Sequence, residues 1–184
     1  MARSSKSAGA LTLLKQDHAE VKDLFDEFED SEDLDDKKTL AIKAISELKV
    51  HARVEEEIFY PALRQAGAAD VVEEADEEHH VAKLLIAELE LMNGSEENFE
   101  AKFTVLAENV RHHIKEEEKE VFAAARKAKL DLDALGQAMA ARKQELKSSG
   151  VPVDDEEQMV RKTGLIPESP SKRAAHDFQF RAWV

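Results

Sequence analysis

Apolar residues recur at steps of three and four along four long stretches of the chain, which is the spacing of one buried face on an α-helix. The stretches cover residues 11–30, 35–65, 69–93 and 96–128. Short links between them favour antiparallel packing of neighbouring helices. We therefore predict an all-α fold whose first domain, residues 11–128, is an antiparallel up-down four-helix bundle.

Glycine and proline mark where these helices should end or bend. Gly67 and Gly94 lie in links between the stretches, where a residue that ends a helix is expected. Pro61 lies inside the second stretch and has no backbone N–H to donate. We expect Pro61 to kink or end that helix.

Beyond the bundle the pattern changes twice. Residues 131–147 carry a shorter apolar face, which predicts an accessory fifth helix on the bundle. Residues 148–184 are richer in Pro, Ser and Gly, which predicts an irregular, extended C-terminal tail. Apolar residues in this tail leave two alternatives open, a strap that packs on the bundle or a docking segment for a protein partner. They are Leu165, Ile166, Phe178, Phe180 and Trp183.

Composition narrows the classes of function. The chain has 26 Lys+Arg against 40 Asp+Glu and a net charge of −14, so we expect no nucleic-acid partner. It has no cysteine, which excludes disulfides and thiolate metal ligands and leaves His and carboxylates for any metal. The sequence has no long apolar segment, so we expect no membrane partner and a cytoplasmic location.

Each predicted helix carries one histidine on its apolar face: His18, His51, His79 and His113. On two of the helices a glutamate, Glu55 or Glu117, follows the histidine by four residues and therefore lies on the same inward face. Carboxylates and imidazoles are costly to bury in an apolar interior unless something compensates them. These positions predict a metal site at one level of the bundle.

The pattern also separates neighbouring histidines and suggests an internal repeat. His80 and His112 fall outside the apolar faces and should face solvent or a flank. The segment KVHARVEEEIF at 49–59 echoes RHHIKEEEKEV at 111–121, which places His51 over His113 and Glu55 over Glu117. The chain therefore resembles two helical hairpins, each with a lone His followed by His-x-x-x-Glu.

Four segments, in this order, resemble the hemerythrin-like, HHE cation-binding domain family: LLKQDHAEVKDLF, HARVEEEIFYPAL, EEHHVAKLLIAEL and HHIKEEEKEVF. The resemblance covers residues 11–128 and implies a four-helix bundle with two non-haem iron ions and a bridging oxygen, able to bind dioxygen. Carried over by position, the four histidines would be terminal ligands, and Glu55 and Glu117 would bridge the irons.

One position departs from the oxygen-carrying members of this family, which have a fifth histidine four residues from the ligand on the third helix. Here those positions are Ala75 and Lys83. In an idealised octahedral count, about two coordination positions then stay open. Three residues are candidates to fill one, although each is more readily a bystander: His80, Glu78 and His176.

Tyr60 has two readings. It could donate a hydrogen bond or act as a redox partner at the site, or it could cap the end of the bundle ahead of Pro61, which we take as the better reading.

Three classes of function fit these residues. The first is a non-haem di-iron protein that binds or senses dioxygen, nitric oxide or iron. The second is an enzyme, a ferroxidase or peroxide-consuming oxidoreductase that uses the open positions. The third is a structural bundle without metal that acts through its tail. We favour the first and keep the second as the alternative; the residue types alone suit iron, manganese and zinc.

Overall fold

The computed structural model describes residues 9–92, 94 and 98–163, and these residues are helical without any strand. The elements in chain order are α1 (Ala10–Asp30), α2 (Leu34–Val54), η1 (Glu55–Phe59), α3 (Tyr60–Gln65), α4 (Asp70–Leu91), α5 (Phe99–Glu116), η2 (Glu117–Val121), α6 (Phe122–Lys127), α7 (Leu132–Ser149) and α8 (Asp155–Thr163).

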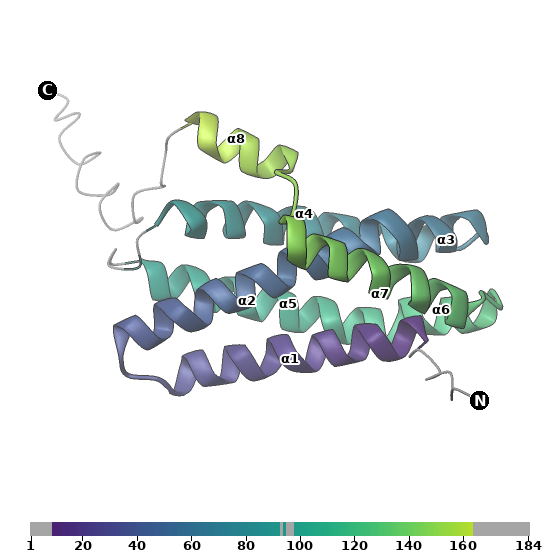
Figure 1. Cartoon of the computed structure of the whole chain (residues 1–184), viewed down its shortest axis with the longest axis horizontal. Helices are drawn as coiled ribbons and strands as arrows, with labels where there is room; N and C mark the ends of the chain where they lie inside the picture. Colours follow the sequence, from purple (N-terminus) through teal and green to yellow (C-terminus); the bar gives the residue numbers. More distant parts are fainter. Residues whose placement is uncertain (1–8, 93, 95–97, 164–184) are drawn as a thin grey trace, which may run out of the picture.

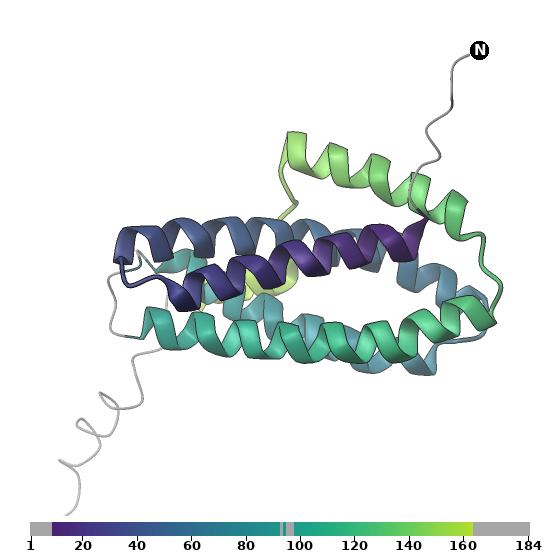
Figure 2. The ribbon, with the colours of Figure 1, turned by 90° about the horizontal axis from the view of Figure 1, so that it is seen from below.

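Four long rods form the bundle (Figure 1). They are α1, the continuous run α2–η1–α3, α4, and the continuous run α5–η2–α6. The first two rods pack as one antiparallel pair and the last two as another, and Figure 2 shows the same arrangement from below. The predicted all-α bundle is confirmed.

Local sequence explains where the rods begin and end. Asp33 starts α2 by accepting hydrogen bonds from the backbone N–H groups of Asp35 (2.9 Å) and Asp36 (3.0 Å). Gly67 ends α3 with a φ of 82°, and the N–H of Ala68 donates to the carbonyl of Leu63 at 3.0 Å. This is the Schellman arrangement that glycine favours, so the predicted helix end at Gly67 is confirmed.

Two five-residue π-helical turns, η1 and η2, interrupt the second and fourth rods. They begin at Glu55 and Glu117, the two glutamates singled out from the sequence. Pro61 is the second residue of α3, after Tyr60, and the helix continues through it to Gln65, so the proline does not end the rod. Such wide turns occur mostly at functional sites, where they re-aim side chains.

The apolar core has two parts. One lies toward the start of α1 and includes Leu14, Phe59 and Phe122; the other includes Phe25, Leu48 and Phe103. On α1, buried His18 lies between the two parts, because Leu14 belongs to the first and Val21 to the second. The polar residues therefore form a layer across the middle of the bundle.

The accessory helix α7 packs across α1 and α2, as predicted, with Met139 and Leu146 buried. Ion pairs hold its charged face to the bundle: Lys143 pairs with Asp17, and Arg142 Nε pairs with Glu57 Oε2 at 2.6 Å. Both contacts attach α7 to residues next to the polar layer.

The first part of the predicted tail differs from expectation, because residues 155–163 form helix α8 instead of extended chain. Asp154 accepts a hydrogen bond from the N–H of Glu157 at 2.8 Å, which caps the helix start. Acidic residues fill its first turn and basic residues its last, which suits the helix dipole. Residues 164–184, with the five apolar residues noted above and His176, lie outside the described residues.

Among the residues described, no helix is both long and apolar enough to cross a membrane.

Candidate metal centre

Six side chains meet in the polar layer, and each rod supplies at least one of them. They are His18 from α1, His51 from α2, Glu55 from η1, His79 from α4, His113 from α5 and Glu117 from η2, and all are buried. The two glutamates are the most deeply buried acidic groups of the described chain, with 0% and 1% of their surface exposed. The structure therefore brings together every residue proposed from the sequence as a ligand.

The Nε2 atoms of the histidines face the two carboxylates and one another. His51 Nε2 lies 3.2 Å and His79 Nε2 lies 3.4 Å from Glu55 Oε2, and His18 Nε2 lies 3.1 Å from Glu117 Oε2. His79 Nε2 and His113 Nε2 are 3.2 Å apart. These separations are those of donor atoms that can share a central ion.

Glu55 belongs to two groups of three donors at once. One group is His18, His51 and Glu55, and the other is Glu55, His79 and His113; within each group the donor atoms lie within 4.8 Å of one another. Glu117 joins the first through His18. Glu55 is therefore the residue that the two groups share.

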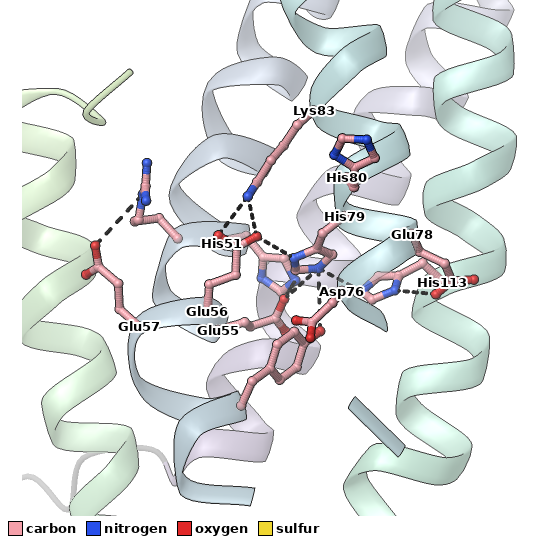
Figure 3. A network of polar contacts seen from close by, with 12 residues as sticks. His51, Glu55, Glu56, Glu57, Asp76, Glu78, His79, His80, Lys83 and His113 are labelled. Atoms are coloured by element: carbon pink, nitrogen blue, oxygen red, sulfur yellow. Dashed lines mark hydrogen bonds and ion pairs between the residues drawn. The ribbon is translucent and has the colours of Figure 1, made fainter. Parts of the chain in front are cut away.

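Each of the four histidines has a carboxylate near its Nδ1 atom, and that carboxylate comes from a neighbouring rod. Glu118 Oε1 lies 3.1 Å from His18 Nδ1 and Asp17 Oδ2 lies 3.6 Å from His51 Nδ1. Figure 3 shows the other two contacts: Glu56 Oε1 lies 3.0 Å from His79 Nδ1, and Glu78 Oε2 lies 2.8 Å from His113 Nδ1.

These four contacts close a ring around the bundle. A carboxylate of α1 lies against the histidine of α2, and a carboxylate of η1 lies against the histidine of α4. In the same way, a carboxylate of α4 lies against the histidine of α5, and a carboxylate of η2 lies against the histidine of α1. Three of these contacts are within hydrogen-bonding distance, whereas Asp17 lies farther from His51 Nδ1. A carboxylate hydrogen-bonded at Nδ1 holds the proton there and leaves Nε2 as the free lone pair, which is the usual support for a metal-bound histidine. We call Asp17, Glu56, Glu78 and Glu118 the outer carboxylates.

Cationic groups lie behind the outer carboxylates. Lys83 Nζ donates to Glu56 Oε2 at 2.8 Å, Lys143 pairs with Asp17, and Lys15 Nζ lies 3.5 Å from Glu118 Oε2. His112 Nε2 lies 3.6 Å from Glu78 Oε1. Three of the four outer carboxylates are thus paired with a lysine among the described residues, whereas the two inner glutamates are not.

The inner donor atoms lack hydrogen-bond partners among the described residues. These buried atoms are His18 Nε2, both ring nitrogens of His51, and all four carboxylate oxygens of Glu55 and Glu117. Buried polar atoms are normally satisfied, and several in one place indicate an ion that the protein is built to hold. Imidazole and carboxylate donors fit iron, and also manganese or zinc.

Residues 9–125 match the family described as Hemerythrin HHE cation binding domain. The chain belongs to this family. A solved structure of a hemerythrin HHE cation binding domain-containing protein from Mycobacterium kansasii is 26% identical, with a TM-score of 0.68, and the match covers 77% of this chain and 89% of that one.

A curated relative of this HHE protein, described as a DNA nickase, comes from Nostoc sp.. It is 31% identical over 115 residues, which is 62% of this chain and 32% of the relative. The chain therefore spans about a third of that relative's length.

The residues considered for an additional ligand take other places in this HHE bundle. Lys83 binds Glu56, Ala75 belongs to the apolar core, and Glu78 is an outer carboxylate. His80 points away from the network in Figure 3, and its Nδ1 contacts Glu156 Oε1 at 2.7 Å. The expectation that His80 and His112 face outward is borne out, since their side chains are 48% and 61% exposed.

From the sequence we preferred to interpret Tyr60 as a cap at the end of the bundle. The structure places it at the site. It is completely buried, and its hydroxyl lies 3.4 Å from His79 Nε2. Tyr60 follows η1 directly as the first residue of α3. Burial and the nearby carboxylates raise the pKa of the phenol well above 10.0, so it stays a neutral hydrogen-bond donor.

Without a cation, the two inner glutamates cannot both carry a charge. Burial raises the pKa of Glu55 well above its usual value, and the neighbouring Glu117 adds to this effect. Burial opposes ionisation of Glu117 too, but the contact with His18 lowers the pKa of Glu117 to about 2. Burial lowers the pKa of His51 to about 4, which keeps its imidazole neutral. A neutral imidazole is the form that binds metal.

Glu56 gives the apoprotein a predictable pH dependence. Although burial opposes its ionisation, His79 and Lys83 lower the pKa of Glu56 from 4.5 to about 2. A depressed folded-state pKa stabilises the fold above about pH 4.5, and this contribution is lost as the pH falls toward about 2. Glu56→Gln should therefore lower the free energy of unfolding of the metal-free protein by about 2 kcal/mol near neutral pH and by roughly half of that or less near pH 3.

Urea unfolding at several pH values measures this difference. Glu57→Gln is the matched control, because Glu57 pairs with Arg142 at the surface and should change stability by less than about 0.5 kcal/mol. An equal effect of Glu56→Gln at neutral and acid pH would contradict the role assigned to its charge.

Proposed function

We propose that this HHE-domain protein holds two non-haem iron ions and uses them to bind or sense dioxygen, with nitric oxide or iron itself as alternative ligands. The observation that carries the proposal is the position of Glu55, which belongs to both groups of three donors. Glu117 supports it as a second carboxylate between His18 and the rest of the layer. One ion would use His18 and His51, and the other would use His79 and His113.

The chemistry of the donor set supports iron as the metal. Neutral imidazoles and carboxylates suit iron in both common oxidation states, and an iron pair supplies reversible redox chemistry and open coordination positions. The surrounding side chains orient the ligands and exclude water. The outer carboxylates hold the histidines with Nε2 inward, and the apolar core on both sides limits access of water.

A small ligand is favoured over a large one. The cavity that reaches the four histidines has a free volume of about 50 Å³, which suits a molecule of a few atoms. Tyr60 does not line this cavity, but its buried hydroxyl lies 3.4 Å from His79 Nε2, so we propose that it donates a hydrogen bond to a ligand held beside His79.

The test is metal analysis combined with absorption spectroscopy. Protein expressed with added iron should contain about two irons per chain, and reduced protein exposed to oxygen should change its spectrum. Less than about 0.2 metal ions per chain would instead favour a structural bundle that acts without metal. Two irons with no response to oxygen or nitric oxide would exclude the sensing role.

The enzymatic alternative rests on the same open positions, since neither Ala75 nor Lys83 supplies a fifth histidine. A ferroxidase or peroxide-consuming enzyme would turn over iron(II) or peroxide many times per centre. Strictly stoichiometric oxidation would exclude this alternative.

Tyr60→Phe separates a ligand-contacting phenol from a packing residue. The substitution keeps the ring and removes the hydroxyl, so metal content should stay unchanged. Affinity for nitric oxide or dioxygen should fall about fivefold, as expected for one lost hydrogen bond. Ligand titration of the iron-loaded variant measures this, and unchanged affinity would assign Tyr60 to packing alone.

DNA nicking, the activity named for the Nostoc relative, is disfavoured for this chain. A net charge of −14 opposes approach to a polyanion, and the similarity covers 32% of the relative named for that activity.

A further inference from the structure

A narrow cavity leads from the metal layer toward the surface of the bundle. The four histidines of the centre line its inner end. Most of its exposed wall is apolar and comes from the rods, with Leu48, Ile86 and Val110 among the residues, although charged side chains such as Lys49 and Arg53 also line it. Its outer end is lined by Val151, Asp154 and Glu157, which belong to α8 and the linker before it.

The segment that covers this outer end is attached mainly by polar contacts. Lys49 of α2 donates to Glu157 Oε2 of α8 at 3.2 Å and to Glu90 Oε1 of α4 at 2.8 Å. Glu156 Oε1 contacts His80 Nδ1 at 2.7 Å. α8 lies along α4 (Figure 1), and Glu157 and Val160 are its buried residues.

Two features make α8 easier to displace than the rods. Neither core cluster of the described chain includes a residue of α8; Val151 of the linker packs against the edge of the first cluster, and Val160 is the one apolar residue that α8 itself buries. The linker begins at Gly150, which has a φ of 86° and open space around it, so the chain can change direction there. Segments with few buried apolar contacts open locally at low cost.

We propose that α8 is a lid over the path to the metal centre, and that its displacement admits small uncharged ligands. This inference rests on the proposed function, because it assigns control of access to the same centre. The Lys49–Glu157 contact closes the outer end, and the apolar walls behind it disfavour charged molecules, which would lose their hydration there.

The first experiment measures opening without any metal. Hydrogen–deuterium exchange of the metal-free protein should show the amides of α8 exchanging at least about tenfold faster than those of α4. Val160→Ser should accelerate exchange in α8 and leave α4 unchanged. Exchange in α8 as slow as in α4 would overturn the lid and would not bear on iron binding.

The second experiment measures entry of a ligand. Nitric oxide is uncharged, so its binding to the iron(II) protein, followed by stopped-flow absorption, is insensitive to a changed surface charge. In Val160→Ser and Glu157→Gln, the association and dissociation rate constants for nitric oxide should both rise about fivefold. Each substitution removes one weak contact that holds α8 closed, so the open state becomes more populated. The dissociation constant should stay nearly constant, because an open lid changes both rates alike.

The control is Met159→Ser, a change at a half-exposed position of the same helix that should leave both rates at wild-type values. Val160 does not line the cavity, so its effect cannot come from altered cavity walls. Unchanged rates in a variant whose α8 exchanges faster would overturn the proposal. Fewer than two irons in the wild type, with fast exchange in α8, would count against the di-iron function and still support the lid.

Discussion

Glu55→Leu should abolish the metal pair, with metal content falling from about two ions per chain to none or a weakly held one. Glu55 is common to both groups of donors, so its loss removes one ligand from each ion. The same substitution should stabilise the metal-free protein by about 1–3 kcal/mol, because it replaces a buried carboxyl that lacks partners with an apolar side chain of similar size. Metal analysis and urea unfolding of the apoprotein measure the two effects.

The opposite signs of these effects separate a lost ligand from a damaged fold. His80→Ala and His112→Ala are the controls, because both side chains are exposed and should leave two ions in place. A Glu55→Leu protein that kept both ions would remove Glu55 from the centre. An apoprotein destabilised by the change would show that Glu55 supports the fold without metal.

Removing the metal from the wild-type protein should lower its free energy of unfolding by about 4 kcal/mol or more at metal concentrations far above the dissociation constant. Binding to the folded state alone stabilises it, and the metal-free layer keeps seven buried donor atoms without hydrogen bonds among the described residues. Thermal or urea unfolding before and after chelation measures the loss, and addition of iron(II) should restore the original stability.

Glu55→Leu again provides the control, because a protein without the centre should unfold at the same point with and without chelator. Equal stability of the loaded and stripped wild type would contradict a metal held inside the bundle.

The outer carboxylates show where sequence reasoning stopped. Asp17, Glu56, Glu78 and Glu118 each lie next to a proposed ligand in the sequence, but they contact histidines on other rods. Helical periodicity places such a residue at the flank of its own helix, where a carboxylate is usually solvated. Which neighbour that flank meets depends on how the helices pack.

The turns η1 and η2 were not predicted either. Five residues are too few for a π-turn to produce a recognisable spacing of apolar positions. The segments EEEIF and EEKEV therefore look like ordinary α-helix in the sequence. The turns matter because they begin at Glu55 and Glu117 and because η1 carries the chain to Tyr60. Helix α8 was missed because its stability depends on a cap and on packing against α4, in a segment of weak apolar pattern.

The sequence by itself determined the four helices, their antiparallel order and the six inward-facing His and Glu residues, because a period of 3.6 residues assigns each side chain to a face. Their roles as ligands, the iron and a cytoplasmic location remain predictions. Only the tertiary structure decided which carboxylate supports which histidine, that Tyr60 lies against the site, and that α8 covers the path to it. These are contacts between helices, and they depend on the rotation and offset of each helix against its neighbours, which no pattern within one helix contains.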